Sequence, residues 1–257
     1  MLWNVDRTIQ VLERGQACPK GQERARLMKY LYLLIDGLTL AGPLVLSFDR
    51  RVAFFRRWKY LFPSIGLMMA IFVPWDMVFT HMGVWGFNPQ YLSGYQIFNL
   101  PIEEVLFFVV VPYACVFIYD CLNSYIKNDV LSRIWRPIGM MLAIALIGIG
   151  VWKFSQLYTS ITFISTGVFV LFNVLNRTAW FSRFLLAYFV SVVPFCLVNG
   201  LLTGSWIEDQ IVWYNSDHII NVRVGTIPIE DVIYSLLMLG LTVCFLEYFT
   251  KKGGKLR

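Results

Sequence analysis

A short acidic motif occurs twice in this chain, and each copy opens a long apolar segment. The copies are Asn99-Leu100-Pro101-Ile102-Glu103-Glu104 and Thr226-Ile227-Pro228-Ile229-Glu230-Asp231. A carboxylate at the centre of a bilayer costs about 2.5 kcal/mol or more, so acids in such a setting usually have a function. Two adjacent carboxyl groups resist double ionisation, and a pair that holds one proton and one charge provides an acid and a base. The duplication therefore predicts acid and base roles for Glu103, Glu104, Glu230 and Asp231.

The residues around each acid pair are typical of a helix start. Pro101 and Pro228 suit a first helical turn, where their missing amide would have no partner, and Asn99 and Thr226 are expected to cap the free amides. Adjacent helical residues point about 100° apart, so one acid of each pair is predicted to face the bundle interior and the other to support it. Proline followed by two acids is also common as capping chemistry alone, and it is the second copy that favours a function.

Aromatic residues gather around both motifs in the sequence. Their ring faces would stabilise a carbocation by about 2 kcal/mol each when desolvated, although Trp and Tyr also gather at membrane interfaces without any chemical role. The predicted cation-stabilising residues are Trp75, Trp85, Phe87, Phe107, Trp213, Tyr214 and Tyr234, with Phe108 next to them. Asp76, Pro101 and Pro228 are predicted to support the acids. Asp36 is interpreted either as a helix-packing group or as part of a proton path.

The composition places the chain in a membrane. Of its 257 residues 58% are hydrophobic, only 15% are charged, and the mean hydropathy is +0.61, which is too apolar for an ordinary soluble domain. The net charge of +6 comes from short basic clusters between apolar runs, which indicate membrane topology and no nucleic-acid partner. The five cysteines are scattered without C-x-x-C spacing, so the sequence predicts no disulfide framework and no metal site.

Seven apolar segments are long enough to cross about 30 Å of hydrocarbon. They run near 28–48, 60–80, 100–121, 136–152, 155–175, 184–203 and 227–249. The connections after the first, third and fifth segments and the tail carry Lys and Arg, which predicts that they are cytoplasmic and that both acid motifs open from the opposite side. Residues 1–27 are too polar for a signal peptide and are predicted to be an extension. We expect an all-α, multi-pass protein of a cell membrane, namely a bacterial inner membrane.

The repeat extends beyond the acid motif. When Pro101 is aligned with Pro228, Phe107 aligns with Tyr234, and the element around Trp85 parallels the element around Trp213 with one residue skipped. A shift of four segments keeps both copies in one orientation, so the sequence predicts two parallel three-helix repeats joined by a linker helix. The expected boundaries are 1–27 for the extension, 28–125 and 154–250 for the repeats, 126–153 for the linker, and 251–257 for a basic tail.

Three further acids are placed by the repeat. Asp76 corresponds to Cys196 or to Asn199, depending on where the alignment carries its gap. Asp120 and Glu247 lie 16 residues beyond the second acid of their motifs, which is about 24 Å along a helix. They are therefore predicted to lie at the other face of the membrane, away from the acid pairs.

These motifs give the chain a family resemblance. Its paired Pro-Ile-Glu-Glu and Pro-Ile-Glu-Asp, the element Val84-Trp85-Gly86-Phe87-Asn88 and the opening Met28-Lys29-Tyr30-Leu31-Tyr32-Leu33 resemble the membrane-integral lycopene cyclases. Such domains occur as heterodimeric subunits in some bacteria, as tandem repeats in archaea and as the cyclase half of fungal bifunctional proteins. The resemblance covers nearly all of residues 28–250 and is to the tandem, single-chain form.

The resemblance implies conversion of the acyclic ψ-ends of lycopene into β-rings, an isomerisation without net redox change. A proton adds to the terminal alkene, the neighbouring double bond attacks the tertiary cation, and loss of a ring proton gives the product. The carboxylates would act as acid and base in unassigned order, within an apolar pocket that excludes water. The flavin-dependent cyclases carry a dinucleotide fingerprint that this sequence lacks, so no cofactor is expected. The implied partners are a lipid-soluble carotenoid and membrane lipid; the sequence makes no prediction of the oligomeric state.

Other functions fit the same residues. A related enzyme would cyclise a longer carotenoid or form a single ring, a choice that depends on the shape of the pocket. A proton-coupled membrane transporter is the alternative from another class, because acids inside a membrane are usual in proton relays; acids at helix ends of a parallel repeat fit a lipid-facing site better. A retinal-binding protein needs a lysine in the last helix, and residues 227–249 contain none.

Overall fold

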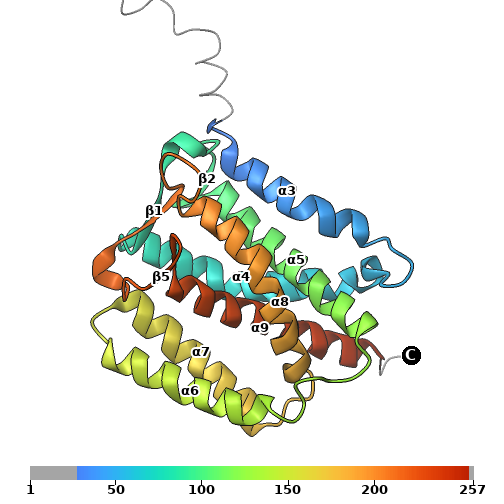
Figure 1. Ribbon diagram of the computed structural model, residues 1–257. Helices are drawn as coiled ribbons and strands as arrows, with labels where there is room; N and C mark the ends of the chain where they lie inside the picture. Colours follow the sequence, from blue (N-terminus) through green and yellow to red (C-terminus); the bar gives the residue numbers. More distant parts are fainter. Residues whose placement is uncertain (1–27, 255–257) are drawn as a thin grey trace, which may run out of the picture.

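The computed structural model describes residues 28–254 as a bundle of helices (Figure 1). The extension predicted for residues 1–27 and the end of the predicted tail, 255–257, lie outside the described residues. In the described part the helices are α3 (Leu31–Leu46), α4 (Trp58–His81), α5 (Ile102–Tyr125), α6 (Trp135–Trp152), α7 (Leu157–Leu175), α8 (Phe181–Leu202) and α9 (Ile229–Gly254). The prediction of a mostly helical protein is confirmed.

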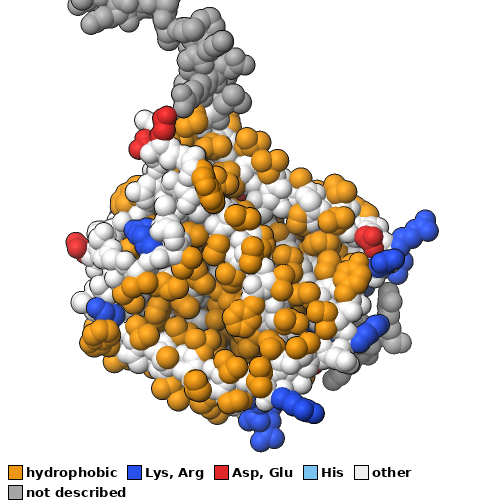
Figure 2. Space-filling view, in the orientation of Figure 1, with side chains coloured by type: hydrophobic (Ala, Val, Ile, Leu, Met, Phe, Trp, Pro, Cys, Tyr) orange, Lys and Arg blue, Asp and Glu red, His pale blue; other side chains and the backbone are white. Residues whose placement is uncertain are grey.

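Six of the helices in residues 28–254, α4 to α9, are long and apolar enough to cross a membrane. Helix α3 is apolar but has 16 residues, which is about 24 Å at the helical rise of 1.5 Å per residue and shorter than a hydrocarbon layer of about 30 Å. It ends at Leu46, two residues before the predicted segment does. The space-filling view agrees with a membrane setting, because hydrophobic side chains cover most of the visible face and charged ones lie toward its edges (Figure 2).

The helices pack in two sets of three with equivalent contacts. Helix α3 lies against α5, and α7 lies against α9. Helix α4 packs mainly on α9 and α8 mainly on α5, so the second helix of each set packs on the third helix of the other set. Helix α6 packs along α7 at the lower edge of Figure 1. With α4 packed on α9 and α8 on α5, the starts of α5 and α9, where the two acid motifs lie, are at the same end of the bundle.

Short strands in the connections before α5 and α9 join the two copies near the acid motifs. Strands β1 (Trp85–Phe87) and β4 (Val212–Tyr214) pair antiparallel, one from each copy, with Gly86 opposite Trp213. Each copy also has its own hairpin directly before the acids. The hairpin strands are β2 (Gln96–Ile97) and β3 (Leu100–Pro101) in the first copy, and β5 (Arg223–Val224) and β6 (Ile227–Pro228) in the second.

The strands correct one part of the predicted repeat alignment. Strands β1, β2 and β3 recur as β4, β5 and β6 at the same constant shift that relates Pro101 to Pro228, so no residue is skipped and Trp213 corresponds to Gly86 rather than to Trp85. The physical reason is a close contact: a Cβ atom on Gly86 would lie 2.3 Å from the Cζ2 atom of Trp213. A glycine is required under this indole, and Trp85 and Trp213 occupy different positions in their strands.

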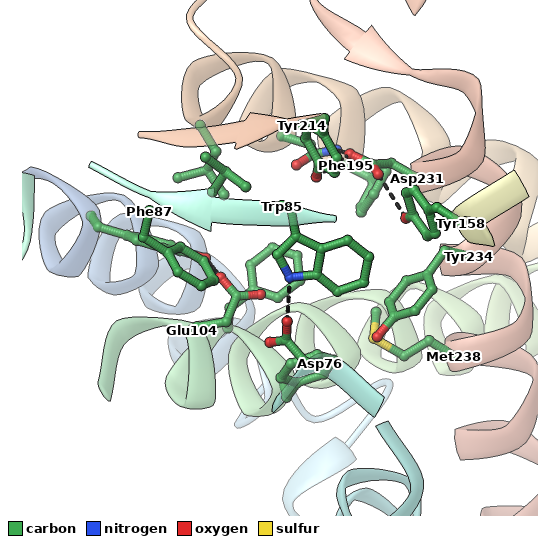
Figure 3. Close-up of a pocket in the computed structure, with 16 residues that line it drawn as sticks. Asp76, Trp85, Phe87, Glu104, Tyr158, Phe195, Tyr214, Asp231, Tyr234 and Met238 are labelled. Atoms are coloured by element: carbon green, nitrogen blue, oxygen red, sulfur yellow. Dashed lines mark hydrogen bonds between the residues drawn. The ribbon is translucent and has the colours of Figure 1, made fainter. Parts of the chain in front are cut away.

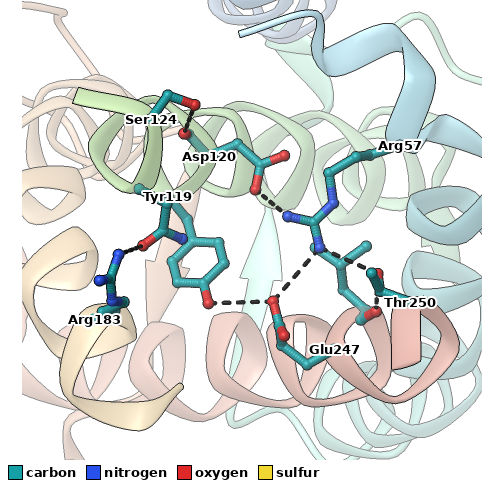
Figure 4. Close-up of polar contacts among 9 residues, drawn as sticks. Arg57, Tyr119, Asp120, Ser124, Arg183, Glu247 and Thr250 are labelled. Carbon is teal, nitrogen blue, oxygen red and sulfur yellow. Dashed lines mark hydrogen bonds and ion pairs between the residues drawn. The ribbon is translucent and has the colours of Figure 1, made fainter. Parts of the chain in front are cut away.

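The opposite end of the bundle carries an ionic cluster (Figure 4). Arg57, in the short 3-10 helix η1 (Phe54–Arg57) before α4, donates from Nη1 to Oδ1 of Asp120 at 2.5 Å and approaches Oε1 of Glu247 with Nη2 at 3.5 Å. The Tyr119 hydroxyl also donates to Glu247, at 3.2 Å. Asp120 and Glu247 thus lie far from the acid motifs, as their spacing predicted, and hold the last turns of α5 and α9 together.

Candidate active site

Helices α5 and α9 begin directly after Pro101 and Pro228, so both acid pairs occupy first helical turns. The predicted caps are wrong. Pro101 itself is the cap residue of α5, with no side-chain cap bond, because it belongs to hairpin strand β3. Asn99 lies in the hairpin turn and donates to the carbonyl of Met77 in α4 at 2.8 Å, while Thr226 pairs with hydroxyl groups beyond the end of α8. These side chains tie the hairpins to neighbouring helices.

The first acid of each pair is fully buried and holds a loop in place. Oε1 of Glu103 accepts the backbone amide of Ser93 at 2.6 Å. Oε1 of Glu230 accepts the backbone amide of Ile220 at 2.7 Å and the hydroxyl of Thr159 at 2.5 Å. Ser93 and Ile220 are equivalent in the repeat, since each precedes its acid by the same interval of 10 positions. Neither acid lines the cavity described next, so both are placed to support the segments that precede their helices.

The second acid of each pair lines one shared cavity (Figure 3). Glu104 from α5 and Asp231 from α9 meet there with Asp76 from α4. The space between the side chains is small, about 50 Å³. The other residues of its wall are mostly aromatic or aliphatic: Tyr32, Trp85, Phe87, Phe107, Phe108, Tyr158, Phe195, Asn199, Leu202, Val212, Tyr214, Tyr234 and Met238. Because this wall comes from both copies, the two motifs contribute to a single site.

Asp231 is surrounded by hydrogen-bond donors. Its Oδ1 accepts the hydroxyl of Tyr158, and its Oδ2 accepts the Asn199 amide and the hydroxyl of Tyr214, each at 2.8 Å. Burial raises the pKa of Tyr214 well above its usual range, and the charge of Asp231 raises it further. This phenol therefore keeps its proton and remains a donor. Three donors stabilise the charged form of a carboxylate.

Glu104 has a different environment. Its Oε2 accepts one hydrogen bond, from the hydroxyl of Tyr32 at 2.6 Å, and its carboxyl group lines the same cavity as that of Asp76. Oδ1 of Asp76 accepts the indole N–H of Trp85 at 2.5 Å and the hydroxyl of Thr80 at 3.3 Å. Oδ2 of Asp76 is buried without a hydrogen-bond partner among residues 28–254. Two nearby carboxyl groups with few donors, in an apolar cavity, favour a shared proton.

The two halves of the site differ in the residue that accompanies the cavity acid. Asn99 donates a hydrogen bond to the carbonyl of Met77, the residue after Asp76. Thr226 donates a longer one to the carbonyl of Gly200, the residue after Asn199. Since Asn99 and Thr226 are equivalent, Asp76 corresponds to Asn199 and not to Cys196. One acid is thus accompanied by a carboxyl group and the other by an amide, so the repeat builds two chemically unequal halves.

Five of the seven predicted aromatic residues line the cavity. The indole of Trp85 lies near the middle of Figure 3, with its ring centroid 4.9 Å from that of Tyr158. Trp75 packs behind the wall, 5.4 Å from the ring of Tyr234. Trp213 faces away and is 42% exposed, because its strand neighbours point into the cavity and successive strand residues alternate. The residues in the wall are Trp85, Phe87, Phe107, Tyr214 and Tyr234.

Two tyrosines that contact the acids were not predicted from the sequence. Tyr32 precedes its acid Glu104 by 72 residues, and Tyr158 precedes its acid Asp231 by 73. The repeat itself carries this signal, since a tyrosine lies within one position of the same place at the start of both copies. Asp36, one turn beyond Tyr32, is buried, and its oxygens have no hydrogen-bond partner among residues 28–254.

Comparisons with known proteins agree with this arrangement. A family model described as lycopene cyclase matches residues 29–122 and 155–249, and each matched region holds one acid motif. The bifunctional lycopene cyclase/phytoene synthase of Aspergillus niger is 23% identical over 201 residues, which are 68% of this chain and 33% of that protein. The chain thus spans about a third of the length of this relative. No solved structure matches the chain.

Proposed function

Because the chain belongs to the lycopene cyclase family, we propose that it is an isomerase that converts the ψ-ends of lycopene into β-rings inside a membrane. The observation that carries the proposal is the single cavity in which Glu104, Asp76 and Asp231 meet aromatic side chains. The reaction needs a proton donor, a proton acceptor and a site that keeps water from a carbocation. Each of these has a counterpart in the cavity wall.

Glu104, together with Asp76, is the proton donor in this proposal. Glu104 has one hydrogen-bond donor and a second carboxyl group nearby, which supports a pair that keeps one proton. The proton adds to the terminal double bond of the substrate and leaves a tertiary cation. The neighbouring double bond then attacks this cation, which closes the six-membered ring and moves the positive charge into it.

Asp231 is the proton acceptor. Its three hydrogen bonds at 2.8 Å support a carboxylate that is already charged when the substrate binds. It removes the proton from the ring carbon next to the cation, and the electron pair of that C–H bond becomes the ring double bond. One proton enters and one leaves, so product and substrate are isomers. The proton returns from Asp231 to Glu104 before the next turnover.

The aromatic wall stabilises the cation between these two steps. Trp85 and Tyr234 reach the cavity from opposite copies of the repeat, and further rings surround them. A ring face within reach of a desolvated cation contributes about 2 kcal/mol. Asp76 orients Trp85 through the hydrogen bond to its indole N–H, so a single side chain serves both the donor and the wall.

We propose that the whole chain is a seven-span protein in which α3 crosses with the other six helices. The units are then two parallel repeats, 28–125 and 154–250, joined by the linker 126–153 with α6. The equivalent packing of α3 on α5 and of α7 on α9 supports this division. The basic residues near the Arg57 end of the bundle support a cytoplasmic location of that end, with the acid cavity near the other side.

Expression in a bacterium that accumulates lycopene tests the proposed function. The cells are expected to change from red to orange-yellow, and chromatography of the pigments is expected to give β-carotene or its one-ringed precursor. A transporter would leave the pigment unchanged, and a cyclase of another carotenoid would leave lycopene intact. Unchanged lycopene in cells that carry the protein in their membrane would refute the proposal.

A further inference from the structure

An apolar groove lies between α3, α5 and α8. Its volume is about 390 Å³, far larger than that of the acid cavity. In Figure 1 helix α5 lies behind the gap between α3 and α8 and forms the floor. The floor residues are largely buried, and the rim residues Leu38 and Leu197 are more than half exposed. The groove is therefore open along its length toward the surroundings of the bundle.

The groove continues the acid cavity. Phe195 of α8 lines both. On α5 the cavity residue Phe108 is followed one turn later by the groove residue Val111, and the groove reaches Ile118. On α3 the cavity residue Tyr32 is followed in the same way by groove residues. From Val111 to Ile118 the groove runs about 10 Å along the helix, so it leads away from the acids toward the middle of the bundle.

The α5 side of the groove carries smaller side chains than the equivalent positions of the second copy. With Pro101 aligned on Pro228, Ala114 and Ile118 on the α5 side of the groove correspond to Leu241 and Phe245 on α9. A small side chain is thus present where space is needed, and a larger one stands at the equivalent place in the second copy. The width of the groove thus depends on side chains that the second copy does not repeat.

We propose that this groove binds the extended polyene chain of the substrate while one ψ-end occupies the acid cavity; the inference rests on the proposed function. The cavity of about 50 Å³ is too small for a long substrate, so most of the substrate has to lie outside it. The groove is apolar, begins at the cavity wall and opens toward the outside of the bundle. Burial of a hydrocarbon chain there is favourable. Because one groove leads to one site, the two ends of lycopene react in separate binding events.

A bulky residue in the groove tests the proposal. Ala114→Phe narrows it away from the acids, and Ala145→Phe makes the same change on the exposed surface of α6. Kinetics are measured in membranes with lycopene and with a shortened lycopene aldehyde that keeps one ψ-end. Ala114→Phe is expected to lower kcat/KM for lycopene about tenfold or more and to spare the short substrate. Ala145→Phe is expected to leave both unchanged.

An equal loss of kcat/KM on both substrates would locate the effect in the cavity and overturn the proposal. Equal kcat/KM values for Ala114→Phe and Ala145→Phe would also overturn it. A second experiment detects binding directly and does not require the protein to be active. A photoreactive benzophenone side chain in place of Leu38 is irradiated in lycopene-containing membranes, with the same group in place of Ile144 on α6 as control. Polyene adducts are expected at the groove only; phospholipid adducts alone at both positions would refute polyene binding. If lycopene cross-links but no ring forms, the proposed function fails and the groove stands.

Discussion

The amide variants of two neighbouring acids, Asp231→Asn and Glu230→Gln, separate chemistry from support. Both replace a carboxyl group in the first turn of α9 with an amide, but only Asp231 lines the cavity. In Asp231→Asn the new NH₂ group faces a phenol or an amide that donates to the carboxylate in the parent protein, so at least one of the three hydrogen bonds is lost. The variant also lacks the base. In Glu230→Gln the amide oxygen still accepts from Ile220 and Thr159.

The expected magnitudes differ widely. Loss of a general base lowers a rate by about 10²–10⁴, or about 2.7–5.5 kcal/mol of transition-state stabilisation. At the supporting position both hydrogen bonds remain, and a change of about 1 kcal/mol in their strength corresponds to less than about tenfold in rate. We therefore expect Asp231→Asn to be nearly inactive and Glu230→Gln to keep most of the parental rate.

The assay is the initial rate of β-ring formation in isolated membranes, with the amount of protein measured by immunoblotting so that loss of folding is not mistaken for loss of chemistry. Glu104→Gln and Glu103→Gln form a second matched pair with the same expected contrast. Equal losses in Asp231→Asn and Glu230→Gln, or a parental rate in Asp231→Asn, would refute the assignment of cavity and supporting acids.

Three further changes test single contacts. Tyr158→Phe removes one donor from Asp231 and is expected to slow ring formation about tenfold, as measured by membrane kinetics; an unchanged rate would contradict the charged role of this acid. Arg57→Met leaves Asp120 without its ion pair and is expected to lower the stability by up to about 3 kcal/mol, seen as a lower unfolding temperature in detergent, whereas an unchanged temperature would show that the pair is unimportant. Gly86→Ala forces a Cβ atom against the indole of Trp213 and is expected to cost about 1–3 kcal/mol; the same measurement should show recovery when Trp213→Ala is added, and no recovery would contradict the contact.

Much of the helical framework follows directly from the sequence, because apolar length and the positions of charges are properties of single segments. Six predicted segments correspond to helices that are long enough to span a membrane, and the first one forms the shorter α3. The packing of α4 on α9 and of α8 on α5 did not follow, because exchange between copies depends on contacts that hydropathy does not encode. Strands of two or three residues in the connections were likewise invisible to periodicity.

The candidate site was predictable in kind and less so in detail. The repeated motif indicated the four acids, but which of two adjacent acids faces the cavity depends on how the bundle packs around each helix start. Strand alternation, which the sequence did not reveal, turns Trp213 away from the site. Asn99 was expected to cap a helix, yet it lies in a hairpin turn and bonds to α4. The matching positions of Tyr32 and Tyr158, in contrast, were already present in the repeat.

The central claim is that the site adds one proton to the substrate and removes another. It is tested most directly by the mass of the product formed in a single turnover by membranes that have been equilibrated in D₂O. The account predicts that the product gains one deuterium for each ring and that Glu104→Gln forms no such product. A cyclic product of unchanged mass would contradict it, because the proton added to the terminal alkene would then not come from an exchangeable group of the protein.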